Sequence, residues 1–308
     1  MKVRLSLVAV LLLALGGTMR AAGTSILFVG NSFTFGSGSA VRFYRADTVT
    51  DLNNEGIGGV PALFKSFTQQ AGLDYEVALE TRGGVGIDFH LENKLGVIGR
   101  RPWDVVVAHG YSTLDADKPR DGAKLVATAK QMADFLRGRN PNVAYYLTAT
   151  WSRADQVYPA KGAWAGQPIE AMAKDVRVAY DKAALASNAK GVIAVGEAFN
   201  RAMATGVADP NPYDGVDHGK INLWTYDQYH ASTQGYYLEA LMVFGSVTGR
   251  DPRSLGQNEC SAYELGMPTS EAKALQQIAF DQLSAGGSIT AAPLVLPKSV
   301  NPERCSAR

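Results

Sequence analysis

The sequence predicts an α/β fold: a three-layer α/β/α sandwich around a mainly parallel sheet of five strands. Short apolar runs alternate with helical patterns along the chain, which is typical of this class. The runs are almost continuously apolar, as in strands that are buried on both faces of a parallel sheet. The chain has 308 residues, 46% hydrophobic and 19% charged, a balance that excludes a disordered or collagen-like protein.

The elements follow one another in the order that such a sheet requires. The first strand is expected at residues 25–29 (SILFV), where every residue after the serine is apolar. Further strands are expected at residues 75–79, 103–108, 142–148 and 191–195. Apolar residues at helical spacing predict helices at residues 61–70, 122–137, 169–186, 197–204, 234–247 and 269–283, the fifth of them preceded by a loop at 206–226.

The first 23 residues have the pattern of a removable signal peptide. Lys2 and Arg4 form a basic start, residues 5–15 are apolar, and residues 21–23 are small, so cleavage is expected before Thr24. The apolar stretch is shorter than the roughly 20 residues that cross a membrane. The sequence therefore predicts a secreted or periplasmic protein without a membrane span.

The charge balance and the cysteine content indicate which partners and which covalent bonds to expect. The chain has 30 Lys and Arg against 29 Asp and Glu and no extended basic run, which argues against a nucleic-acid partner. Its two cysteines, Cys260 and Cys305, are expected to form a disulfide in an oxidising compartment, the alternative being two free thiols.

Two short motifs carry candidate catalytic residues. Gly30, Asn31 and Ser32 directly follow the first predicted strand, at the edge of the sheet where open α/β proteins bind ligands. Asp227 precedes His230 by three residues, so its carboxylate can accept the Nδ1 proton of the imidazole and leave Nε2 free as a general base. Each motif alone also fits a plain turn or a surface Asp-His pair.

Together, and in this order, the motifs resemble those of the SGNH (GDSL-like) hydrolase superfamily. The similarity is greatest to a poorly characterised branch whose serine block reads GNSFT, as residues 30–34 do. It spans residues 25–252 and implies a flavodoxin-like hydrolase domain at 24–252, with residues 253–308 as a C-terminal extension packed on it. It also implies that Ser32 is the nucleophile, His230 the general base and Asp227 its partner, with no cofactor.

The resemblance also points to donors for an oxyanion. Residues 83–90 (GGVGIDFH) resemble the family's glycine block, which implies that the Gly84 backbone N–H acts beside that of Ser32. The next block departs from the family, because Ser112 stands at the spacing of the usual asparagine and His109 stands where the branch tends to have a polar side chain. Either residue could donate a hydrogen bond or contact substrate, or neither.

Aromatic residues are expected near the same edge of the sheet. Trp151 follows the fourth strand and Trp224 precedes the Asp-His motif, and at a cleft mouth their rings could stack on sugars, packing being the alternative. The histidines show no paired metal-ligand spacing, so no metal site is expected, and His90 is interpreted as structural; they are His90, His109, His218 and His230.

These observations predict an exported serine esterase that hydrolyses O-acyl esters, above all O-acetyl esters, of small molecules or carbohydrates. Two alternatives remain open. A polysaccharide O-acetyltransferase would use the same three residues, and a catalytically weak carbohydrate-binding protein would fit the missing asparagine and the tryptophans.

Overall fold

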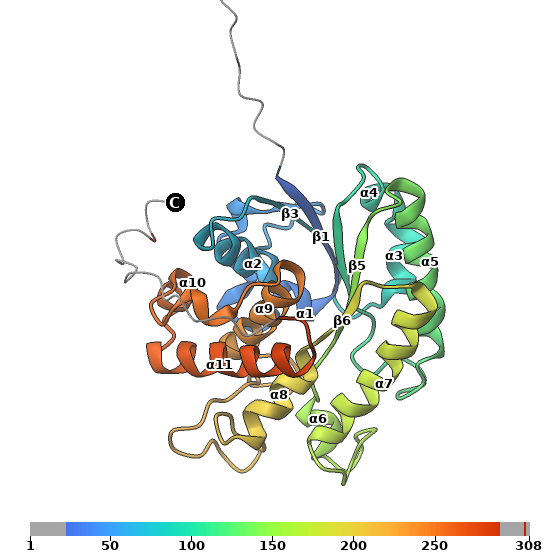
Figure 1. Ribbon diagram of the computed structural model, residues 1–308. Helices are drawn as coiled ribbons and strands as arrows, with labels where there is room; N and C mark the ends of the chain where they lie inside the picture. Colours follow the sequence, from blue (N-terminus) through green and yellow to red (C-terminus); the bar gives the residue numbers. More distant parts are fainter. Residues whose placement is uncertain (1–22, 290–304, 306–308) are drawn as a thin grey trace, which may run out of the picture.

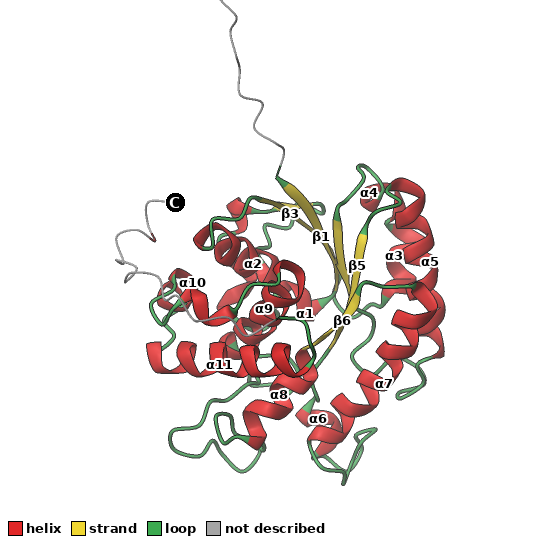
Figure 2. Cartoon of the chain, viewed as in Figure 1, coloured by secondary structure: helices red, strands yellow, loops and turns green. Residues whose placement is uncertain are grey.

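A sheet of six parallel strands runs through the centre of the molecule (Figures 1 and 2). The computed structural model describes residues 23–289 and residue 305, so the predicted signal peptide lies outside the described residues except for Gly23. The strand order is β2-β3-β1-β4-β5-β6. The strands are β1 (Thr24–Gly30), β2 (Thr50–Asp51), β3 (Tyr75–Thr81), β4 (Val105–Ala108), β5 (Ala144–Ala149) and β6 (Gly191–Ala194).

The predicted three-layer α/β fold is confirmed, but the predicted count of five strands is wrong. The additional strand, β2, has two residues and lies at the edge of the sheet beside β3. It pairs Thr50 with Ala78 and Asp51 with Leu79. Two polar residues make no apolar run, so the sequence pattern gives no sign of this strand.

Helices cover both faces of the sheet (Figure 1). On one face α5 packs against α3 and α7, and on the other α9 packs against α2, α8 and α11. The α-helices are α1 (Ser32–Phe35), α2 (Gly59–Gln70), α3 (Ile87–Asn93), α4 (Leu95–Ile98), α5 (Ala123–Arg139), α6 (Ala154–Val157), α7 (Glu170–Ser187), α8 (Val195–Ala204), α9 (Thr233–Thr248), α10 (Cys260–Glu264) and α11 (Thr269–Ala285). Three short 3-10 helices complete the described chain: η1 (Ala40–Phe43), η2 (Ala46–Thr48) and η3 (Pro252–Leu255).

Helix α9 is buried on nearly every side. Every residue from Gly235 to Gly245 is buried, because α2, α8 and α11 pack on this helix and it also contacts β6. All of these residues except Glu239 are apolar, aromatic or glycine, as expected of a core helix, whereas a surface helix has one apolar stripe. The segment before α9 is thereby fixed against the body of the molecule, and this segment carries Asp227 and His230. Among the described residues no helix is long and apolar enough to cross a membrane.

The topology gathers the predicted functional segments at one edge. Strand β1 lies between β3 and β4, with Gly30 opposite Thr81 and Val29 opposite Ala108. All these strands run in the same direction, so their carboxyl ends meet at the same edge of the sheet. The segments that follow β1, β3, β4 and β5 therefore lie close together there.

The predicted disulfide is present. Cys260 and Cys305 are bonded, with their Cα atoms 5.3 Å apart. Arg45 donates from Nη2 to the Cys305 carbonyl at 2.8 Å and also pairs with Glu264 on α10. The bond joins Cys305 to Cys260, the first residue of α10.

Reduction of this disulfide should lower the melting temperature by several degrees and leave the predicted esterase activity nearly unchanged. The bond closes a loop with a sequence separation of 45, worth about 4 kcal/mol in the chain-entropy model. Melting curves with and without reductant, together with activity at room temperature, test this. Loss of activity while the fold stays intact would instead mean that the C-terminal segment shapes the active site.

Candidate active site

The Asp227–His230 pair has the geometry of an oriented general base. The imidazole Nδ1 lies 2.6 Å from Asp227 Oδ2. The other carboxylate oxygen, Oδ1, accepts hydrogen bonds from Thr225 Oγ1 (2.7 Å) and from the backbone N–H groups of His230 (2.9 Å) and Tyr229 (3.0 Å). Four hydrogen bonds hold the carboxylate, so the imidazole can take one orientation against it.

Hydrogen bonding also determines the charge of Asp227. Partial burial by itself would raise the pKa of this carboxyl, but the hydrogen bonds from His230, Thr225 and Tyr229 together lower it to about 2. Asp227 is therefore ionised at neutral pH and favours the tautomer of His230 that carries its proton on Nδ1. His230 Nε2 is buried and has no hydrogen-bond partner in the described part of the chain. This nitrogen is free to accept a proton.

Ser32 stands at the turn between β1 and α1. Asn31 caps α1, its Oδ1 accepting from Phe33 N at 3.1 Å. The Asn31 Nδ2 group donates to the carbonyls of Val85 (2.8 Å) and Gly110 (3.2 Å), which follow β3 and β4. One side chain thus ties the serine turn to the two neighbouring loops. The Ser32 carbonyl accepts from Tyr236 on α9 at 3.3 Å.

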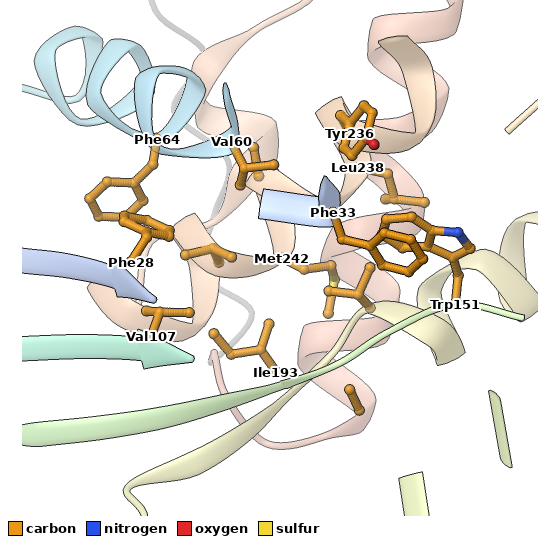
Figure 3. Close-up of a cluster of buried hydrophobic side chains, with 14 of the residues drawn as sticks. Phe28, Phe33, Val60, Phe64, Val107, Trp151, Ile193, Tyr236, Leu238 and Met242 are labelled. Carbon is orange, nitrogen blue, oxygen red and sulfur yellow. The ribbon is translucent and has the colours of Figure 1, made fainter. Parts of the chain in front are cut away.

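An aromatic cluster joins two segments of the site. One is the serine turn, residues 30–32 between β1 and α1, and the other is the Asp-His loop, residues 225–230. Phe33, the neighbour of Ser32, stacks on Trp151 with ring centroids 4.0 Å apart and planes at 10° (Figure 3). The same phenylalanine meets the rings of His230 and Tyr229 edge to face, at 5.8 and 5.5 Å. The segments that carry Ser32 and His230 are therefore packed against each other through Phe33.

Trp151 and Trp224 do not line a cleft mouth, so their predicted role in stacking on sugars is wrong. Their exposed fractions are 0% and 1%. Trp151 Nε1 donates to the Tyr229 carbonyl at 3.2 Å, and Trp224 Nε1 donates to the Ser152 carbonyl at 3.0 Å. Both indoles hold the Asp-His loop against the segment after β5, which is the packing alternative that the sequence left open.

His109 does not contact substrate either, because its two ring nitrogens bond within the protein. Nδ1 lies 3.1 Å from the Gly110 carbonyl and Nε2 lies 2.7 Å from Thr34 Oγ1. A carbonyl only accepts, so Nδ1 carries the proton and Nε2 accepts from Thr34. Burial lowers the pKa of His109 to about 4, which leaves it neutral at physiological pH. His109 anchors the serine helix to the end of β4.

His90 lies beneath the serine turn in a buried ion-pair cluster. Its Nε2 donates to the Gly30 carbonyl at 3.0 Å and its Nδ1 bonds to Glu80. Lys94 lies 3.7 Å from Glu80 as well. Burial alone would raise the pKa of Glu80, but His90, Asn53 and Lys94 lower it. Both nitrogens of His90 are thus satisfied by protein atoms, which is the structural role inferred from the sequence.

The two predicted oxyanion donors besides Ser32 lie within two residues of the carbonyls that Asn31 contacts. Gly84 has a left-handed backbone (φ +74°) and precedes Val85, the residue that Asn31 contacts. Ser112 Oγ accepts a hydrogen bond from Arg153 Nη1 at 3.3 Å. Their action on an oxyanion stays a prediction.

Sequence reasoning missed four residues of the site: Asn31 as the tie between loops, Thr225, Tyr229 and Arg153. Thr225 could have been found, because it stands two residues before Asp227, a spacing at which a hydroxyl reaches a turn carboxylate. Arg153 and Tyr229 meet across 76 positions of the chain, and no local pattern indicates such a contact.

Comparison with known proteins shows which solved structures have a similar fold. No protein-family model matches the chain, and no curated protein matches it. Solved structures do match. A DUF4886 family protein from Bacteroides uniformis is 15% identical with a TM-score of 0.56, covering 87% of this chain and 97% of its own. A putative GDSL-like lipase from Parabacteroides merdae is 16% identical with a TM-score of 0.51, covering 74% of this chain and 96% of its own. An acetyl xylan esterase is 18% identical with a TM-score of 0.50, covering 72% and 99%.

These likenesses confirm the fold that the resemblance to the SGNH superfamily implied. The chain shares the α/β architecture of GDSL-like lipase and esterase structures over most of its length. Sequence identities of 15–18% define the fold, and the chemistry has to be argued from the site itself.

Proposed function

We propose that the chain is a serine ester hydrolase in which Ser32, His230 and Asp227 act as a catalytic triad. The observation that carries this proposal is the free, buried Nε2 of an imidazole whose Nδ1 is held by Asp227, in a ring packed on the neighbour of Ser32. A carboxylate–imidazole pair next to a serine at the carboxyl end of a parallel strand is the arrangement that activates a hydroxyl.

In the proposed reaction Ser32 Oγ attacks the ester carbonyl while His230 Nε2 takes the hydroxyl proton. The tetrahedral intermediate collapses as the imidazolium protonates the leaving alcohol, which gives an acyl-serine and a free alcohol. Water then attacks the acyl-serine, again with His230 as base, and the carboxylic acid leaves. Asp227 stays ionised and stabilises the imidazolium. We assign the oxyanion contacts to the backbone N–H groups of Ser32 and Gly84 and to the Ser112 hydroxyl.

We propose that the substrates are O-acetyl esters of carbohydrates. We also propose that the protein is exported and hydrolyses them outside the cytoplasm. Support for carbohydrate comes from the name of one structural neighbour, an acetyl xylan esterase, and from exposed tyrosines near the Asp-His pair. Tyr226, next to Asp227, is 86% exposed. Tyr213 is 49% exposed, and partial burial together with the charges of Asp155 and Asp227 raises the pKa of its phenol. Support for export comes from the leader pattern of residues 1–23 and from the disulfide.

Acetate release from 4-nitrophenyl acetate and from acetylated xylo-oligosaccharides tests the proposal. We expect both to be hydrolysed, and Ser32→Ala to lower kcat by about 10⁴-fold or more. Ser37→Ala, in the same segment, is the matched control and should keep full activity.

Adding an unacetylated sugar acceptor separates hydrolysis from transfer. The proposal predicts that acetate appears in water with or without the acceptor. Acetyl transfer to the acceptor in preference to water would establish the transferase alternative. Sugar binding without Ser32-dependent turnover of either ester would establish the binding-protein alternative.

A further inference from the structure

Arg153 lies four residues after the end of β5 and packs on Tyr229 of the Asp-His loop. Its guanidinium makes two parallel hydrogen bonds to Asp155, from Nε to Oδ1 at 2.9 Å and from Nη2 to Oδ2 at 2.6 Å. The remaining nitrogen, Nη1, donates to Ser112 Oγ at 3.3 Å. Three contacts hold the guanidinium plane in one orientation, and only 13% of the side chain is exposed.

The guanidinium, Tyr229 and His230 form a column of three stacked groups. The central carbon of Arg153 lies 3.4 Å from the centroid of the Tyr229 ring. The imidazole of His230 lies 4.0 Å from the same centroid, with its plane inclined by 30°. Two groups this close to one centroid cannot share a face of the ring without overlapping. Arg153 and His230 therefore lie on opposite faces of Tyr229.

The column gives His230 a lateral support that its bond to Asp227 does not supply. The Nδ1–Oδ2 hydrogen bond fixes where the imidazole edge points, whereas the Tyr229 ring fixes the tilt of its plane. Tyr229 is itself half-buried and contacts Phe33 only by its edge. Its outer face is covered by Arg153, whose attraction to an aromatic face holds the ring in place.

We propose that Arg153 is a positioning residue for His230, acting through the Tyr229 ring that separates them. The proposal rests on the proposed function, since it concerns the base of that reaction. A role in binding an anionic substrate is disfavoured, because Asp155 already neutralises the guanidinium and Tyr229 covers its face. Ser112 links the same guanidinium to the segment after β4.

Arg153→Met tests the proposal, because it removes the charge and the planar group but keeps much of the side-chain bulk. We expect kcat for 4-nitrophenyl acetate to fall about 10- to 100-fold with KM changed by less than about threefold, as for a displaced catalytic group. Arg153→Lys keeps the charge but loses the planar guanidinium and its two parallel hydrogen bonds, so its kcat should lie between those of Arg153→Met and the wild type.

The chain offers a closely matched control in Arg253. This arginine is also held by an aspartate two residues before it, Asp251, and its central carbon lies 3.2 Å from the ring centroid of Phe280. It belongs to the C-terminal segment. Arg253→Met should therefore lower the melting temperature as Arg153→Met does, while kcat stays at the wild-type value.

Substitutions of Tyr229 keep the test decisive if Arg153→Met does not fold. Tyr229→Phe retains the ring and should retain kcat, whereas Tyr229→Leu should lose as much of kcat as Arg153→Met. The proposal is overturned if Arg153→Met or Tyr229→Leu keeps wild-type kcat, or if Arg253→Met loses as much kcat as Arg153→Met. Absence of Ser32-dependent turnover in the unaltered protein would overturn the proposed function first, and this proposal with it.

Discussion

Replacement of His230 by alanine should abolish ester turnover, lowering kcat by about 10⁶-fold, the size of effect seen when the base of a serine triad is removed. The expectation follows from His230 Nε2, which has no hydrogen-bond partner in the described chain and is therefore free to accept the Ser32 proton. His218→Ala, which removes an exposed histidine, should leave kcat unchanged.

Asp227→Asn should leave more residual activity than His230→Ala, with a loss of about 10⁴-fold. The carboxylate orients the imidazole but does not carry the proton, and the Tyr229 ring still supports the imidazole plane. Because its hydrogen bonds lower the pKa of Asp227 to about 2, the carboxylate is ionised in an assay at neutral pH, and the substitution removes a full negative charge. Initial rates of 4-nitrophenyl acetate hydrolysis measure both variants. An equal loss, or a greater one at Asp227, would contradict this division of roles.

Gly30→Ala should displace Ser32 and lower activity, because an added Cβ atom has no room beneath the serine turn. A Cβ atom at this position would lie 2.1 Å from Thr34 Oγ1 and 2.6 Å from His109 Nε2. These two atoms form the hydrogen bond that anchors α1 to the end of β4, so either the bond breaks or the serine turn moves. We expect overpacking to lower the free energy of unfolding by about 1 to 3 kcal/mol. Displacement of Ser32 should in addition lower kcat strongly in the protein that remains folded.

The control for Gly30 is Gly138, which lies in α5 with no atom within 4 Å of its added Cβ. Gly138→Ala should stabilise the protein by about 0.4 to 1 kcal/mol, because it restricts the unfolded chain. Denaturant unfolding and initial rates on both variants measure these effects. Wild-type activity in Gly30→Ala would mean that the Thr34–His109 contact does not position Ser32.

The sequence predicted most of the fold because its main strands and helices carry their own periodic patterns. In β1 the run from Ile26 to Val29 is apolar, and between Gly235 and Gly245 of α9 Glu239 is the one charged residue, so these patterns place both elements in the core. β2 could not be predicted, since two residues at an edge pair through backbone atoms alone. α3 was missed because its residues were interpreted as part of a glycine-rich loop, although Ile87 and His90 lie on its buried face.

The site was only partly predictable, for a related reason. Asp227 and His230 are neighbours in sequence, so a local spacing was enough to indicate their pairing. Trp151 contacts Phe33 and His109 contacts Thr34, both beside Ser32, but a sequence does not show whether such a ring is exposed or buried. Their burial is decided by Phe33 and Thr34, which reach them from a distant segment. Arg153 depends on the same kind of long-range contact.

Labelling with a fluorophosphonate, followed by intact-mass measurement and peptide mapping, shows whether Ser32 is an activated nucleophile. A serine activated by His230 attacks the phosphorus and keeps the phosphonyl group, whereas an ordinary surface serine does not react at neutral pH. If Ser32, His230 and Asp227 form a catalytic triad, we expect one label per molecule, on Ser32, and no label on Ser32→Ala or on the heat-unfolded protein. A label on another residue, or none on the native protein, would contradict it.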